Sequence, residues 1–200
     1  MNSFKLFKIL VAYISIVAVA NGNLVTLDGQ CPPAKLNPSN SIIPVIPKAI
    51  FTQLAETAPE SGMNRTDAVT IWLQRPEEIE IRNVVRSKET GDCVVYSAFM
   101  KGPDPMTGEF DALYQVAPDT GFVGYKVQFL WFDPSSLTGI ALACHNLSDS
   151  QYQAEIFVLS ATQTEYNEVM QEIVKEVLEE NNIEVLNQYM VKIDHENKCF

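Results

Sequence analysis

Residues 122–132 read FVGYKVQFLWF and form the longest strand candidate in a chain of 200 residues. Apolar and aromatic side chains recur there at every second position, namely Val123, Tyr125, Val127, Phe129 and Trp131. The positions between them begin with a glycine, a lysine and a glutamine. Because successive side chains of a strand point to opposite faces, this alternation predicts one aromatic, buried face and one more polar face.

Shorter stretches of similar composition lie on both sides of this strand. They are separated by turn signals such as the Gly- and Pro-rich segment 102–108. They cover residues 69–74, 79–86, 93–100, 110–116, 137–144 and 154–161, and residues 183–193 add a last short strand. Residues 23–47 are rich in Pro, Asn and Ser, which predicts an extended, irregular lead-in. The series favours a mainly β fold, either a sandwich or a closed antiparallel barrel of about eight strands.

The spacing of apolar residues changes near the C-terminus. Over residues 166–180 they recur at intervals of three and four, at Val169, Met170, Ile173, Val174, Val177 and Leu178. This period predicts one amphipathic α-helix, with Thr164 as its N-cap and Asn181-Asn182 as its end. We expect the helix to pack on the sheet through Val169, Ile173 and Val177, rather than to bind a partner.

Composition and charge restrict the classes of function. Apolar residues make up 46% of the chain and charged residues 20%, which is typical of a globular protein. The 14 Lys and Arg residues against 25 Asp and Glu residues give a net charge of −11. Such a charge repels phosphate backbones and anionic lipid surfaces, so we expect no nucleic-acid partner.

The N-terminus has the composition of a secretory signal peptide. Lys5 and Lys8 precede the apolar run 9–20, and small residues follow, so cleavage is expected after Ala20 or Gly22. The run has about a dozen residues, whereas a membrane-spanning helix needs roughly 20. We therefore predict a signal peptide over 1–22, no integral membrane segment, and a single secreted, extracellular domain over 23–200.

Secretion determines how the cysteines are interpreted. Extracellular thiols oxidise, and the intervals between the four cysteines do not fit a zinc site, so two disulfides are expected among Cys31, Cys93, Cys144 and Cys199. Four cysteines allow three connectivities, and their spacing does not select one. Two N-glycosylation sequons, at Asn64 and Asn146, lie in polar stretches and are expected to carry glycans.

Three stretches resemble the lipocalins, especially the branch of apolipoprotein D, insect Lazarillo and the bilin-binding proteins. They are the opening Asp28-Gly29-Gln30-Cys31-Pro32, the segment YKVQFLWFDP at 125–134, and the helix followed by ENNIEV at 180–185 and Cys199. The resemblance is strongest in the C-terminal half. It implies an up-and-down antiparallel β-barrel with one C-terminal helix packed against it, and disulfides Cys31–Cys144 and Cys93–Cys199.

The sequence departs from the lipocalins at one end of the barrel. Lipocalins usually carry Gly-x-Trp in the first strand, where the Trp closes the barrel floor. The matching residues 48–53 read KAIFTQ and contain neither residue. The arginine that follows the last barrel strand in lipocalins is also missing, because Ser160-Ala161-Thr162 stands there. The chain therefore resembles a divergent member of the superfamily.

The residues favour binding over catalysis. Motifs of serine hydrolases, zinc proteases and phosphate-binding loops are absent from the sequence, and its two histidines, His145 and His195, do not form a catalytic set. We expect no enzyme, no cofactor and no metal. The resemblance implies a monomeric carrier of a small hydrophobic molecule, such as a lipid, retinoid or bilin. The expected pocket lining is Tyr96, Tyr114, Tyr125, Phe129 and Trp131.

A second interpretation belongs to a different class of function. The aromatic side chains of the strands can also simply fill the barrel, as they do in small barrels without ligands. The protein would then bind a cell-surface or secreted protein through its loops, as an inhibitor for example. An acidic secreted enzyme is the third and most distant alternative. The volume of the pocket distinguishes the first two.

Overall fold

A computed structural model describes residues 24–33, 48–58, 65–102, 109–115, 121–196 and 199. The predicted signal peptide and the sequon at Asn64 lie outside these residues, as does most of the lead-in 23–47. Asn146 lies within them, at the end of a strand, and is exposed. The described part of the chain contains no helix with the length and hydrophobicity needed to cross a membrane.

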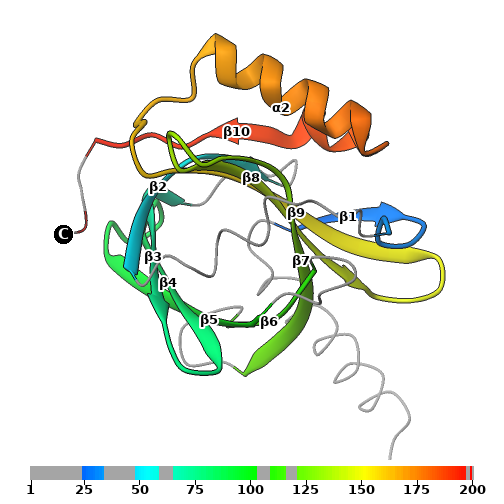
Figure 1. The fold of residues 1–200 in the computed structure, drawn as a ribbon, viewed down its shortest axis with the longest axis horizontal. Helices are drawn as coiled ribbons and strands as arrows, with labels where there is room; N and C mark the ends of the chain where they lie inside the picture. Colours follow the sequence, from blue (N-terminus) through cyan, green and yellow to red (C-terminus); the bar gives the residue numbers. More distant parts are fainter. Residues whose placement is uncertain are drawn as a thin grey trace, which may run out of the picture.

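Eight consecutive strands form a closed antiparallel barrel, seen end-on in Figure 1. Each strand pairs with the next, and β9 also pairs with β2, which closes the barrel. The strands are β2 (Lys48–Thr57), β3 (Arg65–Gln74), β4 (Glu78–Ser87), β5 (Cys93–Lys101), β6 (Phe110–Gln115), β7 (Phe122–Asp133), β8 (Thr138–Asn146) and β9 (Gln151–Ser160). The predicted mainly β fold with a barrel of about eight strands is confirmed.

Two short strands lie outside the eight. β1 (Val25–Asp28) pairs with the first residues of β9, and β10 (Met190–Lys192) pairs with the last residues of β2. The predicted strand over 183–193 is wrong for most of its length, because a 3₁₀ helix, η3 (Glu184–Tyr189), precedes β10. The backbone N–H of Ile183 donates to Leu178 O, and Leu186 is fully buried, so the chain folds tightly against the end of the helix instead of extending.

The predicted helix is present as α2 (Glu168–Glu180), packed on the outside of the barrel (Figure 1). Its N-cap is Asn167 and not Thr164, because Asn167 Oδ1 accepts the backbone N–H of Met170 at 3.0 Å. An Asn side chain at this position satisfies one of the free N–H groups of the first turn. Asn181 caps the other end, as expected.

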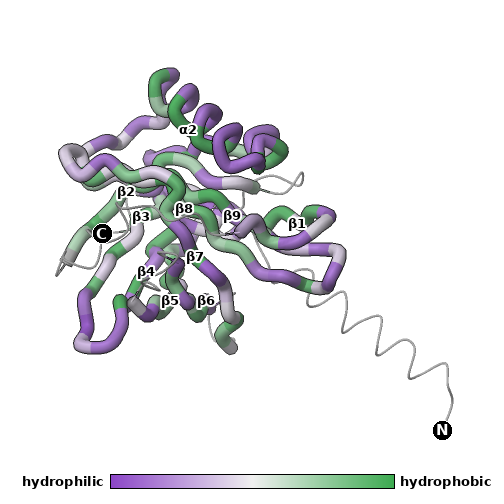
Figure 2. Tube along the Cα trace, turned by 45° about the vertical axis from the view of Figure 1, so that its right-hand side comes forward, coloured by the Kyte–Doolittle hydropathy of each residue, from purple (hydrophilic) through white to green (hydrophobic). Residues whose placement is uncertain are grey.

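The buried face of α2 differs in part from the prediction. Met170, Val174, Val177 and Leu178 are buried, whereas Val169 is 70% exposed. At about 100° per residue these four positions form one stripe, Ile173 lies at its edge, and Val169 lies well outside it. Ile173 is accordingly half-buried. Figure 2 shows α2 as alternating hydrophobic and hydrophilic segments, as expected for a helix with one buried face.

Apolar side chains gather in two main clusters on opposite sides of the barrel wall. The outer cluster lies between α2, η3 and the outward faces of β8 and β9, and includes Ile140, Leu142, Ile156, Val158, Val174 and Leu178. The inner cluster fills part of the barrel with side chains from β2 to β9, among them Phe51, Trp72, Phe110, Phe129 and Phe132. The helix therefore covers the wall from outside, and the site described below is inside.

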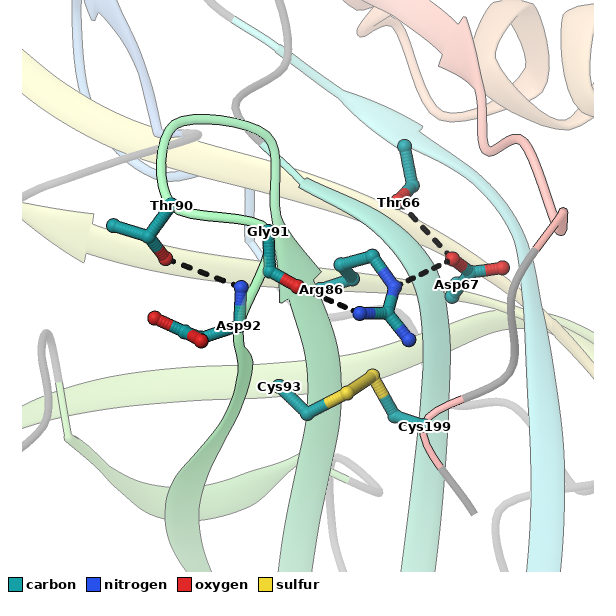
Figure 3. Close-up of a disulfide and its surroundings, with 8 residues drawn as sticks. All are labelled: Thr66, Asp67, Arg86, Thr90, Gly91, Asp92, Cys93 and Cys199. Atoms are coloured by element: carbon teal, nitrogen blue, oxygen red, sulfur yellow. Dashed lines mark hydrogen bonds and ion pairs between the residues drawn. A yellow bond between two sulfur atoms is a disulfide. The ribbon is translucent and has the colours of Figure 1, made fainter.

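Both disulfides have the pairing that the lipocalin resemblance implies. Cys31–Cys144 joins the segment after β1 to β8, with Cα atoms 5.9 Å apart. Cys93–Cys199 joins the start of β5 to the C-terminal tail, with Cα atoms 5.7 Å apart. Figure 3 shows the second bridge beside Arg86, which donates to Gly91 O at 2.6 Å and lies 3.4 Å from Asp67 Oδ2. Each bridge closes a loop of more than 100 residues in sequence.

Candidate functional site

One end of the barrel interior is closed by aromatic rings. Trp72 of β3 lies between Phe51 of β2 and Phe129 of β7, with ring centroids 5.1 and 5.8 Å away. Phe129 also contacts Phe110 and Phe132, at 6.1 and 6.4 Å. Residues 48–53 do form the first barrel strand, where a lipocalin carries its floor tryptophan, but the tryptophan comes from the neighbouring strand. Trp72 pairs directly with Ala49, whose small side chain leaves space for an indole.

A β-bulge in β7 determines which aromatic residues face inward. Phe129 pairs with Ala141 and Trp131 with Ile140, so Leu130 is the extra residue. The bulge reverses the alternation, because one added residue moves the following side chains to the opposite face. Phe132 therefore packs in the inner cluster, and Trp131 packs in the outer cluster near the helix. The prediction that Trp131 shares the face of Tyr125 and Phe129 is wrong.

The other predicted lining residues lie on the inner side of the wall. Tyr114 and Tyr125 are in contact, with ring centroids 5.4 Å apart, and Tyr125 also lies 5.4 Å from the ring of His145. Phe129 belongs to the aromatic floor. Tyr96 packs beside Val85 in a third, smaller cluster. The structure thus brings Tyr114, Tyr125 and Phe129 together, places Tyr96 farther round the barrel, and separates Trp131 from them.

Charged residues lie inside the barrel, beyond the aromatic floor. Arg65 of β3 donates from Nε to Glu56 Oε1 at 2.7 Å and pairs with Glu56 Oε2 through Nη2. The same Nη2 donates to Glu155 Oε1 of β9 at 3.0 Å. The side chain of Glu56 is fully buried, and those of Arg65 and Glu155 are only 15% and 12% exposed. We call Glu56, Arg65 and Glu155 the Arg65 cluster.

The hydrophobic alternation of the sequence gives no sign of this cluster. Its three members come from three strands, and Arg65 and Glu155 are 90 residues apart in the sequence. Glu56 lies in β2, whose inward positions include the buried polar residue Gln53. That polar content explains why residues 48–57 do not show the period-two pattern of a half-buried strand. A buried ion pair costs desolvation energy, which the hydrogen bonds within the cluster must offset.

The Arg65 cluster changes the proton affinities of its neighbours. Burial, opposed by the charge of Arg65 and assisted by the charge of Glu56, raises the pKa of Glu155 to about 8. Burial also raises the pKa of the Tyr114 and Tyr125 hydroxyls, and the charge of Glu155 adds to both shifts. Both tyrosines therefore remain neutral hydroxyl groups at physiological pH, able to donate and accept hydrogen bonds.

A small void lies between the aromatic floor and the polar groups. Its volume is about 30 Å³, and it is bounded by residues of seven strands that include Thr70, Trp72, Asn83, Tyr114, Phe129 and Phe157. That volume corresponds to about one water molecule. A second, larger hollow of about 440 Å³ lies along β5 to β8, and residues of both faces of the wall line it, among them Phe99, Leu113, Tyr125, Lys126 and His145.

Comparison with known proteins supports the fold. Neither a search of protein-family models nor a search of curated proteins finds a match. Among solved structures, lobster apocrustacyanin A1 superposes with a TM-score of 0.65 at 13% identity, over 86% of this chain and 92% of that chain. H1 crustacyanin from the lobster Homarus americanus gives a TM-score of 0.64 at 11% identity, over 86% of this chain and 91% of that chain.

Insecticyanin from the tobacco hornworm Manduca sexta gives a TM-score of 0.61 at 12% identity, over 88% of this chain and 91% of that chain. At such identities the likeness concerns the fold. Together with the closed eight-strand barrel, the helix and the two bridges, it shows that the chain has the lipocalin fold.

The raised pKa of Glu155 predicts a pH-dependent stability. The folded state retains the proton of Glu155 up to about pH 8, whereas the unfolded chain releases it near the ordinary value of 4.5. Between these two pH values the native state binds more protons than the unfolded chain does. The free energy of unfolding therefore falls as pH rises, by at most about 1.4 kcal/mol per pH unit. We expect Glu155→Gln to flatten this fall in thermal unfolding curves recorded from pH 5 to 8.

The matched control is Glu172→Gln, at a glutamate on the exposed face of α2 whose side chain is 72% exposed. This variant should keep the pH slope of the parent protein. If Glu155→Gln and Glu172→Gln give the same slope, then Glu155 does not retain its proton in the folded state.

Proposed function

We propose that the protein is a secreted carrier of lipocalin type, which holds a small and mainly apolar molecule inside its barrel. The observation that carries this proposal is the mixed chemistry of the interior. An interior that served only as a core would be filled with apolar side chains, since buried charges and hydroxyls are costly. This barrel instead combines an aromatic floor with the Arg65 cluster and with the hydroxyls of Tyr114 and Tyr125.

Such a combination is typical of small-molecule sites, in which apolar walls supply affinity and a few polar groups fix the orientation. In this proposal Tyr114, Tyr125 and Phe129 line the site and Tyr96 borders it near Arg65, whereas Trp131 has no direct part. The predicted signal peptide over 1–22 and the two disulfides support secretion, because disulfides persist in oxidising compartments. We propose a non-enzymatic role, without cofactor or metal.

One observation favours a second candidate, a protein-binding lipocalin with a filled barrel. Among the described residues, the void at the aromatic floor has a volume of about 30 Å³, far smaller than the 300–1,000 Å³ of typical ligand pockets, so a retinoid or bilin at this position requires side chains to move. In addition, Leu113 and Phe122 are 48% and 46% exposed on the outer face of the barrel, and Phe122 lies beside Phe99. Exposed apolar residues of this kind are common at protein interfaces.

Tryptophan fluorescence tests the first candidate, because the two tryptophans lie on opposite sides of the barrel wall. Retinol, palmitate and biliverdin are titrated into the secreted protein, and native mass spectrometry records any co-purifying molecule. We expect at least one of these probes to change the emission of Trp72, and the response to persist in Trp131→Phe. An unchanged emission with every probe, together with a protein mass that shows no bound molecule, would favour the protein-binding candidate.

A further inference from the structure

The indole of Trp72 carries a buried hydrogen-bond donor without a partner among the described residues. Trp72 is 5% exposed, and among the described residues its Nε1 makes no hydrogen bond. Buried tryptophans usually satisfy this N–H, because an unpaired donor loses its hydration without compensation. Contacts with Phe51 and Phe129 hold the ring in place. The donor is therefore fixed in position before any ligand arrives.

Three further polar side chains, those of Thr70, Asn83 and Tyr114, line the void with Trp72. The Thr70 hydroxyl donates to Asn83 Oδ1 at 2.8 Å, so the oxygen of this amide is occupied and its NH₂ group remains a donor. The hydroxyl of Tyr114 can also donate, since its raised pKa keeps it protonated. The residues that line the void thus carry an indole N–H, an amide NH₂ and a phenolic O–H, and its volume of about 30 Å³ is close to that of one water molecule.

From this geometry, and on the basis of the carrier function proposed above, we infer that Trp72, Asn83 and Tyr114 form a subsite for a neutral carbonyl oxygen at the inner end of the bound molecule. A carbonyl oxygen offers two lone pairs and no hydrogen, which matches a site rich in donors. The aromatic floor then contacts the carbon atoms beside the carbonyl. The ligand class is an apolar ketone, aldehyde or ester.

Charge selects the carbonyl over a carboxylate. The Arg65 cluster has two carboxyl groups for one guanidinium, so it offers no unbalanced positive charge to an anion. Glu155 lies close enough to Tyr114 to influence its hydroxyl, and the whole chain has a net charge of −11. An anionic head group would lose its hydration without gaining a counter-charge, whereas a neutral carbonyl loses little.

A matched ligand series tests the subsite. The probes are 2-decanone, 2-methyl-1-decene, in which a methylene group replaces the ketone oxygen, and decanoate, with affinities measured by isothermal titration calorimetry. We expect Trp72→Phe to lower the affinity ratio of ketone to alkene about tenfold, as for the loss of one hydrogen bond. Trp131→Phe, the control at the other tryptophan, should leave the ratio unchanged, and decanoate should bind more weakly than the ketone.

A second measurement does not depend on the Trp72 variant folding well. The parent protein has two tryptophans, so its ¹⁵N spectrum contains two indole N–H signals, which Trp131→Phe assigns. The ketone should shift the Trp72 signal, and the alkene should leave it near its free position. If ketone and alkene bind with equal shifts, or decanoate binds best, the subsite is wrong while the carrier function stands. If none of the three binds, both proposals are overturned.

Discussion

Arg65→Met is expected to destabilise the protein by about 3–5 kcal/mol, the typical cost of removing one partner from a buried ion pair. The substitution keeps much of the apolar length of the side chain but leaves Glu56 and Glu155 facing each other without a cation. Glu56 is fully buried, so water cannot take the place of the guanidinium without opening the barrel. Chemical denaturation at pH 8 measures the loss as a change in the free energy of unfolding.

The pH dependence of this loss distinguishes electrostatics from packing. In the variant, Glu155 no longer has the guanidinium that lowers its pKa, so it retains its proton to still higher pH. Above pH 8 the folded parent protein releases this proton and the folded variant keeps it, so the stability of the variant falls faster with rising pH, and the loss should be smaller at pH 5 than at pH 9. The double variant Arg65→Met, Glu56→Gln should recover part of the stability. A loss of equal size at both pH values, without recovery, would indicate a packing defect.

Val174→Asp is expected to cost about 3–5 kcal/mol, because it places an unpaired carboxylate between α2 and the barrel wall. Val174 is fully buried in the outer cluster, together with Leu178, Ile156 and Val158. The matched control is Val169→Asp, five residues earlier on the same helix, where the side chain is 70% exposed. That variant should change stability by less than about 0.5 kcal/mol, as is usual for surface substitutions.

Thermal unfolding followed by circular dichroism measures both variants. Equal midpoints for the two variants would show that α2 is not held against the barrel through the face that contains Met170, Val174, Val177 and Leu178. The comparison also separates the effect of the new charge from the effect of its position, since both variants introduce the same side chain into the same helix.

The local periodicities of the sequence were sufficient for much of the fold. β7 alternates over its first eight residues, and α2 shows the three-and-four spacing of a helix, so both elements follow from patterns within one segment. β2 lacks such a pattern, because Gln53 and Glu56 occupy interior positions that a regular core would give to apolar residues. A polar interior of this kind hides a strand from any analysis based on hydrophobic alternation.

The candidate site was predictable only in part, for two physical reasons. Tyr125 and Phe129 keep the alternation of β7, but the bulge at Leu130 depends on pairing with β8, and it moves Trp131 to the outside. The Arg65 cluster depends on barrel closure, which brings β9 next to β2 and so brings Glu155 to Glu56. Contacts between strands that are distant in the sequence leave no local periodicity in either strand.

The placement of the two short outer strands gives the disulfides a role beyond chain entropy. β2 pairs with the last residues of β9 only, and β1 pairs with the first four residues of β9 along the same edge. Likewise β3 pairs with β2 over Lys48–Thr52, and β10 covers Ala55–Thr57.

Cys31 follows β1 and Cys199 follows β10, so each bridge fastens the strand that shields an otherwise open backbone edge. Reduction would release both shields and expose unpaired N–H and C=O groups, which are templates for strand-to-strand aggregation. In a reducing compartment this barrel would fail first by self-association at its seam and not by loss of its core.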